Sequence, residues 1–153
     1  MDIETPLIRA GEEIRAQIRY SREQITQFAH LTGDMNPLHH DRQAAERASF
    51  GEIIASGQQT AAQMMGVASS HFSRGDDGLA REVLCLECQF AFPAPVFAAT
   101  EVQIEWRVVA IERNTSRGGF VGRLEGEARV GGRVCVSGRA ALLVRRAASR
   151  LSH

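Results

Sequence analysis

Hydrophobic and polar residues alternate along four segments in the second half of the chain. A period of two is typical of strands that bury one face. A shorter alternation over residues 12–20 predicts a first strand before them. Gly131 and Gly132 separate the last two segments and indicate a tight hairpin, so we expect the sheet to be antiparallel. The apolar positions of the four segments are Leu84, Leu86, Cys88, Phe90 and Phe92; Val102, Ile104, Trp106 and Val108; Phe120, Leu124, Ala128 and Val130; and Val134, Val136, Ala140, Leu142 and Val144.

Two helices are predicted directly after the first strand. Ser21 and Gln24 form a capping-box pattern, and Gly33 stands where that helix would end. Asp41 can cap a short second helix, which residues 49–51 would terminate. The segment between the two helices is therefore expected to be a turn.

A third predicted helix begins at Ser56, which repeats the capping-box pattern with Gln59. Residues 61–68 of this helix are apolar on nearly every side, which is typical of a helix surrounded by protein. One buried helix followed by a sheet with one apolar face favours an α+β fold in which the curved antiparallel sheet wraps a long central helix.

The composition fits a globular protein that needs no disulfide or metal to hold its core. The chain has 153 residues, of which 44% are hydrophobic and 24% charged, and we expect residues 1–153 to form a single domain. All 18 basic residues are arginine, the formal net charge is zero, and no basic stripe indicates a nucleic-acid partner. Residues 1–11 do not resemble a signal peptide, and no apolar run has the length of a membrane span.

Three cysteines are present, and their odd number fits a reducing compartment, so we expect a cytoplasmic protein. Cys85 and Cys88 have the spacing of a redox or zinc pair. On a strand, however, positions three apart point to opposite faces. We therefore expect no metal site at this pair.

Residues with acid-base chemistry are concentrated between the first and third helices. Asp34, Asn36 and His39 fall in a turn, because Gly33 and Pro37 both oppose helix continuation. A carboxylate and an imidazole in one short loop can share a water or a substrate proton.

Gly57 adds a different kind of group to this chemistry. It falls in the first turn of the third helix, where backbone N–H groups lack partners within the helix. Such an N–H can bind an oxygen atom that gains negative charge during a reaction.

The same segment resembles the MaoC-like family of (R)-specific enoyl-CoA hydratases and dehydratases, which has the hot-dog fold. The resemblance is densest from residue 28 to residue 57 and is only a pattern from residue 82 to residue 144. Its residues are Phe28, Leu31-Thr32-Gly33-Asp34, Asn36-Pro37-Leu38-His39, Asp41, Ala45, Phe50-Gly51, Ile54-Ala55 and Ser56-Gly57.

The resemblance implies a hydro-lyase that reversibly hydrates trans-2-enoyl-CoA to (R)-3-hydroxyacyl-CoA. In this reading Asp34 and His39 activate a water, with Asp34 as the base, and Gly57 binds the thioester oxygen. Asn36 and Ser56 are supporting residues. The resemblance implies no metal and no redox cofactor, and coenzyme A enters as part of the substrate. It also implies that the chain forms a homodimer or a higher homo-oligomer.

Several alternatives remain open on the sequence alone. The substrate can be carried by acyl-carrier protein, or it can be a branched or dicarboxylic acyl-CoA. A thioesterase and a non-catalytic acyl-CoA-binding subunit are further alternatives. Asn36 can be simply a turn residue, and Met64 and Met65 can be core residues or can line an acyl tunnel.

Two positions differ from the common family pattern. Ser56 stands where many members have histidine, and residues 95–100 stand where a Gly-Asp-Thr turn is frequent. We expect these differences to affect the choice of substrate rather than the type of reaction.

Overall fold

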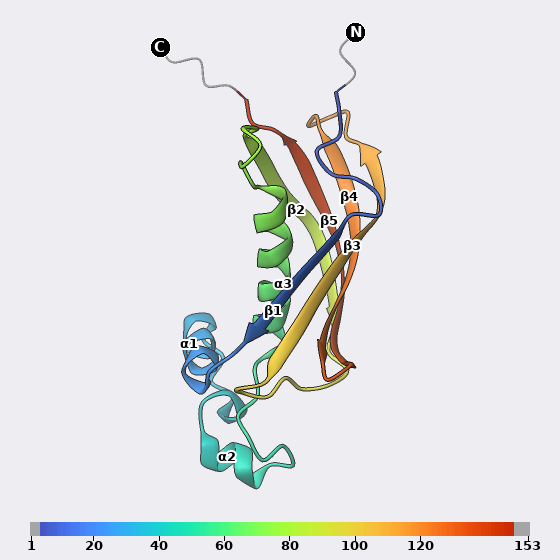
Figure 1. Cartoon of the computed structure of the whole chain (residues 1–153). Helices are drawn as coiled ribbons and strands as arrows, with labels where there is room; N and C mark the ends of the chain where they lie inside the picture. Colours follow the sequence, from blue (N-terminus) through green and yellow to red (C-terminus); the bar gives the residue numbers. More distant parts are fainter. Residues whose placement is uncertain (1–3, 149–153) are drawn as a thin grey trace, which may run out of the picture.

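The computed structural model describes residues 4–148 and contains all the helices and strands that the sequence predicts. It adds one short 3₁₀ helix, η1, to them (Figure 1). The elements are β1 (Glu13–Arg19), α1 (Arg22–Thr32), η1 (Pro37–His39), α2 (Arg42–Arg47), α3 (Gly57–Phe72), β2 (Arg81–Ala91), β3 (Glu101–Arg113), β4 (Phe120–Val130) and β5 (Arg133–Arg146).

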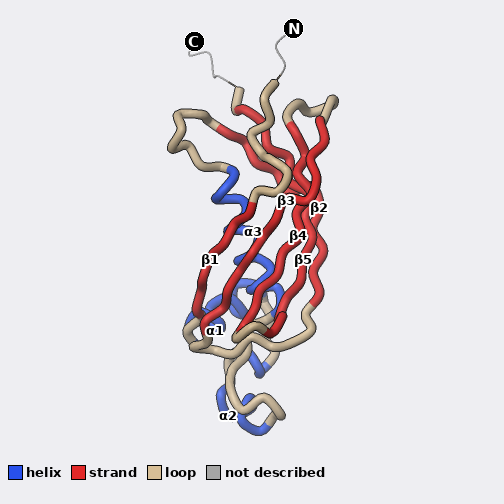
Figure 2. Tube along the Cα trace, turned by 45° about the vertical axis from the view of Figure 1, so that its right-hand side comes forward, coloured by secondary structure: helices blue, strands red, loops and turns tan. Residues whose placement is uncertain are grey.

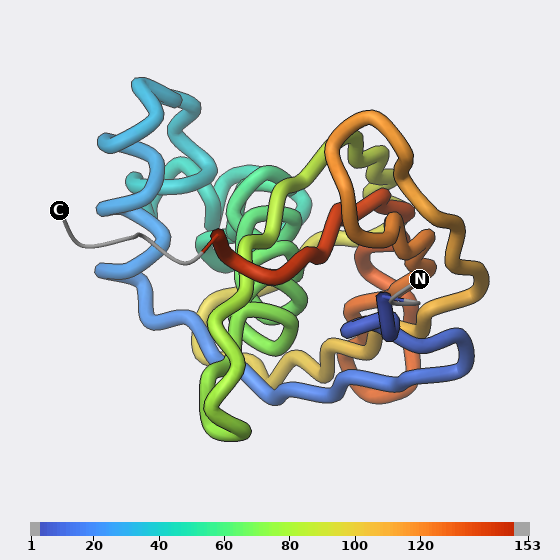
Figure 3. The backbone as a smooth tube through the Cα atoms, turned by 90° about the horizontal axis from the view of Figure 1, so that it is seen from above, coloured from blue at the N-terminus to red at the C-terminus, as the bar shows by residue number. Residues whose placement is uncertain are grey.

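The five strands form one antiparallel sheet in the order β1-β3-β4-β5-β2, so β1 and β2 are its edges (Figure 2). The predicted hairpin joins β4 to β5, and Gly131 and Gly132 both have positive φ angles, which glycine adopts without strain. Helix α3 lies along one face of the curved sheet (Figure 3). Helices α1 and α2 lie at one end of the sheet, beside the start of α3 (Figure 1).

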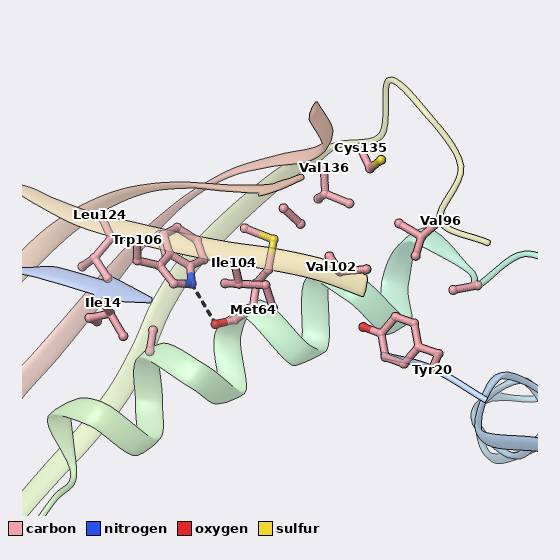
Figure 4. Close-up of a cluster of buried hydrophobic side chains, with 14 of the residues drawn as sticks. Ile14, Tyr20, Met64, Val96, Val102, Ile104, Trp106, Leu124, Cys135 and Val136 are labelled. Carbon is pink, nitrogen blue, oxygen red and sulfur yellow. Dashed lines mark hydrogen bonds between the residues drawn. The ribbon is translucent and has the colours of Figure 1, made fainter. Parts of the chain in front are cut away.

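The core lies between α3 and the sheet. Strand β3 shows the predicted alternation, because Val102, Ile104, Trp106 and Val108 are all buried while their neighbours in the strand are exposed. The indole N–H of Trp106 donates a hydrogen bond to the carbonyl of Met64 on α3 at 2.8 Å (Figure 4). A bond of this kind contributes roughly 1 kcal/mol, and it also fixes how the helix is oriented on the sheet.

Helix α3 is enclosed on one side only, which corrects the expectation that protein surrounds it. Gln59, Thr60, Met64, Ala68 and Phe72 are its buried residues. The opposite side is open to solvent and carries Ala62, Gln63, Gly66, Ser69 and Ser70. Alanine and glycine counted as apolar in the sequence pattern, but they have too little side chain to indicate which face must be covered.

The predicted packed face of β2 is wrong because the strand contains a bulge. The register shifts between Cys85 and Glu87, so Leu86 is an extra residue. Leu84 pairs with Leu143 and faces away from α3, whereas Cys88 pairs with Ala140 and faces the same side as the main core. Leu84 and Leu86 are 44% and 40% exposed.

The bulge also changes the arrangement of the two cysteines on β2. Cys85 pairs with Leu142 and Cys88 with Ala140, so both thiols lie on the same face rather than on opposite faces. Burial, followed by the neighbouring Cys88, raises the pKa of Cys85 above its ordinary value. Both residues are nevertheless exposed.

Candidate active site

The carboxylate of Asp34 is fixed by the turn that follows α1. Gly33 ends α1 in the left-handed conformation, with a φ of 73°. One carboxylate oxygen of Asp34 then accepts the backbone N–H of Asn36 at 3.1 Å. The side chain of Asn36 accepts the backbone N–H of Leu38 at 3.2 Å and so caps η1, where Pro37 is the first residue. Asn36 thus organises the turn through both its backbone and its side chain.

His39 lies beside Asp34, with its Nε2 atom 3.5 Å from the second carboxylate oxygen. The imidazole is 8% exposed and the carboxylate 33% exposed, so solvent reaches the pair from the Asp34 side. The other ring nitrogen, Nδ1, lies 2.7 Å from the carbonyl of Ile54. A carbonyl only accepts hydrogen bonds, so Nδ1 carries a hydrogen and a neutral ring presents an unprotonated Nε2 to Asp34.

This arrangement leaves two proton acceptors side by side when the imidazole is neutral. A carboxylate oxygen and an unprotonated Nε2 can accept the two hydrogens of one water molecule. When the ring is protonated, Nε2 becomes a donor next to an anion. The pair can therefore hold a water and exchange a proton with it.

The start of α3 is connected to the Asp34–His39 pair through hydrogen bonds of the segment before it. Ser56 is the N-cap, and its hydroxyl accepts the backbone N–H of Gln59 at 3.3 Å. Gly57 is the first helical residue, so its N–H has no partner within the helix. The second half of the predicted capping box is wrong, because the Gln59 side chain donates to the carbonyl of Gln24 instead, at 3.4 Å.

Residues 53–55 connect the Asp34–His39 pair to Gly57. The backbone N–H of Ile54 donates to the carbonyl of Leu38 at 3.1 Å, while the Ile54 carbonyl accepts from His39. On the other side, Ala55 donates to the carbonyl of Val96, and Ala98 donates to the carbonyl of Ile53, both at 2.9 Å. The two halves of the candidate site are therefore joined by backbone hydrogen bonds.

An ion pair that the sequence did not reveal ties α1 to the same segment. The Arg22 guanidinium donates to both carboxylate oxygens of Glu52, at 3.0 and 2.6 Å. These hydrogen bonds, together with one from the backbone N–H of Ile53, lower the pKa of Glu52 to about 2. The two residues are thirty positions apart, so no local pattern indicates the contact.

The segment 95–100, which differs from the family pattern, forms a turn with one unusual residue. Ala99 has a φ of 59°, in the left-handed region that favours glycine. Its backbone N–H donates to the carbonyl of Tyr20 at 2.7 Å, which holds this conformation.

Met64 is fully buried in the core, and Met65 packs against it.

A broad open concavity of about 1180 Å³ lies on the face of the sheet away from α3. Its lining is a mixture of arginine and glutamate side chains from the strands, including Arg107, Glu125 and Arg139. It contains none of Asp34, His39 and Gly57. Despite its size we place the candidate site at the start of α3, because the lining of the concavity includes no histidine to pair with a carboxylate.

Residues 4–148 contain neither a cluster of metal-ligand side chains nor a helix that could span a membrane. No three histidine, cysteine, aspartate or glutamate side chains in this range gather closely enough to hold a metal ion. No helix in the same range has both the length and the apolar character needed to cross a membrane.

The sequence is similar to two kinds of enzyme that act on acyl thioesters. It is 26% identical over 107 residues to the (R)-specific enoyl-CoA hydratase of Aeromonas caviae. The aligned region covers 70% of this chain and 75% of that relative. The sequence is 30% identical over 66 residues to the mitochondrial 3-hydroxyacyl-[acyl-carrier-protein] dehydratase of Arabidopsis thaliana, which covers 43% of this chain. The match spans only 40% of the length of that plant relative.

Solved structures agree with the hot-dog fold. The (R)-hydratase of A. caviae superposes with a TM-score of 0.74 at 26% identity, covering 89% of this chain and 96% of that one. The ChsH1-ChsH2 complex of Mycobacterium tuberculosis gives a TM-score of 0.75 at 15% identity, covering 90% and 98%. The predicted α+β hot-dog fold, a curved antiparallel sheet against a long helix, is confirmed.

A family model described as the MaoC like domain matches residues 6–125, which include the Asp34–His39 turn, the start of α3 and the first three strands. The match extends well beyond the segment that carries the resemblance in the sequence. The chain therefore belongs to the MaoC-like domain family.

Proposed function

We propose that this protein reversibly hydrates trans-2-enoyl-CoA to (R)-3-hydroxyacyl-CoA. The observation that carries the proposal is the 3.5 Å approach of His39 Nε2 to the Asp34 carboxylate, with Nδ1 tied to Ile54. Its relatives supply the reaction class, since they include a hydratase and a dehydratase of acyl thioesters.

In the hydration direction His39 is protonated, and a water that donates a hydrogen bond to the Asp34 carboxylate attacks C3 of the enoyl thioester. Asp34 takes one proton from this water as the C–O bond forms. His39, in its protonated form, gives a proton from Nε2 to C2, and the proton on Asp34 returns to His39 across the 3.5 Å separation. One hydroxyl and one hydrogen are added, so the atoms balance, and the reverse sequence is dehydration.

Between these proton transfers, negative charge develops on the thioester oxygen. The N–H of Gly57 supports this role, because it lies at the positive end of the 16-residue helix α3 and has no partner within that helix. One such donor is worth about 2.7–4 kcal/mol of barrier stabilisation. Ser56, by capping the helix, and Asn36, by shaping the turn, are supporting residues in this proposal.

The reaction as proposed requires no metal and no redox cofactor, because proton transfer and one amide donor supply all of its chemistry. Coenzyme A takes part only as the carrier of the substrate. A non-catalytic acyl-CoA-binding subunit is the weaker alternative, since such a protein has no need for a paired carboxylate and imidazole. We further propose that residues 1–153 act as one domain and that the protein works in the cytoplasm.

A direct assay tests the proposal and separates it from the alternatives. Purified protein is mixed with straight, branched and dicarboxylic enoyl-CoA, and with enoyl thioesters on acyl-carrier protein, and the loss of enoyl absorbance is followed. We expect turnover of enoyl-CoA, with a product that only an (R)-specific 3-hydroxyacyl-CoA dehydrogenase oxidises. Preference for acyl-carrier protein would favour the dehydratase alternative, which the Arabidopsis relative supports. Release of free thiol without hydration would indicate a thioesterase and would contradict the proposal.

We also propose that the chain forms a homodimer along β2. This strand is an edge of the sheet, and its unpaired backbone groups are a ready site for a second strand. The large apolar side chains of Leu84 and Leu86 on this strand are exposed. The side of α3 that points away from the sheet is exposed as well. Closed pairs of identical chains are the commonest assembly of soluble oligomers.

A single charge tests this interface. Leu86→Asp should weaken self-association on the order of tenfold or more, because it places a desolvated carboxylate at the contact. Val109→Asp is the matched control, since Val109 is 46% exposed but lies on β3, an interior strand next to the opposite edge of the sheet. Sedimentation over a range of concentrations measures both. A monomeric wild type, or a Leu86→Asp variant that associates normally, would rule out this interface.

A further inference from the structure

The side chain of Phe92 lies directly against Gly57. Phe92 follows the last residue of β2, thirty-five positions after Gly57. A Cβ atom added to Gly57 would lie 2.6 Å from Cδ1 of the Phe92 ring and 2.8 Å from Cγ and Cε1. Real Cβ contacts are essentially never shorter than 3.0 Å. The ring therefore occupies the space that any larger residue at position 57 would need.

One backbone hydrogen bond joins the segment after Phe92 to the segment before Gly57. After Phe92, the chain continues into Ala94 and Val96, which are both buried. The Val96 carbonyl accepts the N–H of Ala55, two residues before Gly57. Moving the Phe92 backbone away from Gly57 would therefore strain the bond between Ala55 and Val96, and otherwise the ring can leave only by changing its rotamer.

The Phe92 ring covers the side of Gly57 on which any other residue would carry a Cβ atom. A glycine at the first position of a helix has no side chain to pack and more backbone freedom than any other residue. Its N–H also has no partner within the helix that would fix its direction. Phe92 is 49% exposed, so its ring covers Gly57 on one side and leaves the other side of the ring open.

We propose that Phe92 is a positioning residue that fixes the direction of the Gly57 N–H by packing against the bare face of this glycine. The inference rests on the proposed function, because it assigns Phe92 to the amide donor of that reaction. It also gives a physical reason for glycine at position 57, which is the volume of the ring rather than a positive φ angle.

A stability cycle tests the contact without relying on activity. In the wild-type background, Gly57→Ala should lower the midpoint of thermal unfolding, because the added methyl group clashes with the ring. In the Phe92→Ala background, the same change should raise the midpoint or leave it unchanged, since alanine is a better helix former than glycine. In a Phe50→Ala background, which removes another partly exposed phenylalanine, Gly57→Ala should still lower it. Equal effects of Gly57→Ala in all three backgrounds would overturn the proposal.

The kinetic effect distinguishes positioning from a purely structural role. Phe92→Ala, assayed well below its unfolding midpoint, should lower kcat by about tenfold to 10²-fold, the range expected for a misplaced catalytic group, while KM changes much less. Phe92→Leu, which refills part of the space, should recover much of the loss. An unchanged kcat in Phe92→Ala would overturn the positioning role. A wild type without hydratase activity would instead contradict the proposed function, and the stability cycle would still decide whether the contact exists.

Discussion

Replacing Asp34 by asparagine is expected to lower kcat for enoyl-thioester hydration by about 10²- to 10⁴-fold, the usual contribution of a general acid or base. In the proposed reaction Asp34 takes a proton from the attacking water, and an amide cannot do so. Asparagine keeps an oxygen that can accept the N–H of Asn36, so the turn should retain its conformation. Loss of enoyl absorbance gives the rate, and circular dichroism with thermal unfolding verifies the fold.

Asp76→Asn is the matched control for this change. Asp76 is an exposed carboxylate in the loop after α3, away from the Asp34–His39 pair, so the same loss of one negative charge should leave kcat near the wild-type value. If Asp34→Asn retained full activity, the assignment of Asp34 as the base would be wrong. If both variants lost activity equally, the loss would reflect net charge and not acid-base chemistry.

Removing the imidazole of His39 is expected to have a comparable effect, again about 10²- to 10⁴-fold in kcat. His39→Ala also deletes the donor to the half-buried Ile54 carbonyl, and loss of such a hydrogen bond costs about 1 kcal/mol of stability. His39→Asn separates these effects, because its side-chain N–H can replace Nδ1–H while nothing replaces Nε2. We therefore expect His39→Asn to be nearly as inactive as His39→Ala but more stable.

The neighbouring imidazole provides the control for His39. Nε2 of His40 lies 3.1 Å from the carbonyl of Met35, and within residues 4–148 the imidazole that forms the close pair with Asp34 is that of His39. His40→Ala should keep most of the activity. A His39→Asn variant with wild-type kcat would contradict the assignment of His39 as the proton donor. A His40→Ala variant as inactive as His39→Ala would contradict it too.

Features that arise within a few residues could be predicted from the sequence. Ser21 and Gln24 form the capping box of α1, and Gly33 ends that helix, because both effects depend on groups within one or two turns. The alternation in β3 was equally informative, since only one phase of the pattern places Trp106 and Val108 in the core. Asp34 and His39 are five positions apart across a turn, so their proximity has a local origin too.

Features that depend on distant partners could not be predicted. Leu84, Cys85 and Leu86 are all apolar, so the pattern does not show which of them is the extra residue in β2; pairing with β5 decides it. The contacts of Arg22 with Glu52 and of Phe92 with Gly57 join residues at least thirty positions apart. In the candidate site, the sequence suggested the acid-base residues, but the protonated nitrogen of His39 depends on a carbonyl fifteen residues away.

The backbone bonds that link Leu38, Ile54 and Ala55 have a consequence for how such a site can change during evolution. Main-chain N–H and C=O groups are the same for every residue type except proline, so side chains along residues 53–55 can vary while the spacing between imidazole and helix start is preserved. Side chains around the candidate site can therefore be exchanged without breaking this backbone link. A proline at position 54 or 55 is the substitution that this lineage should never accept.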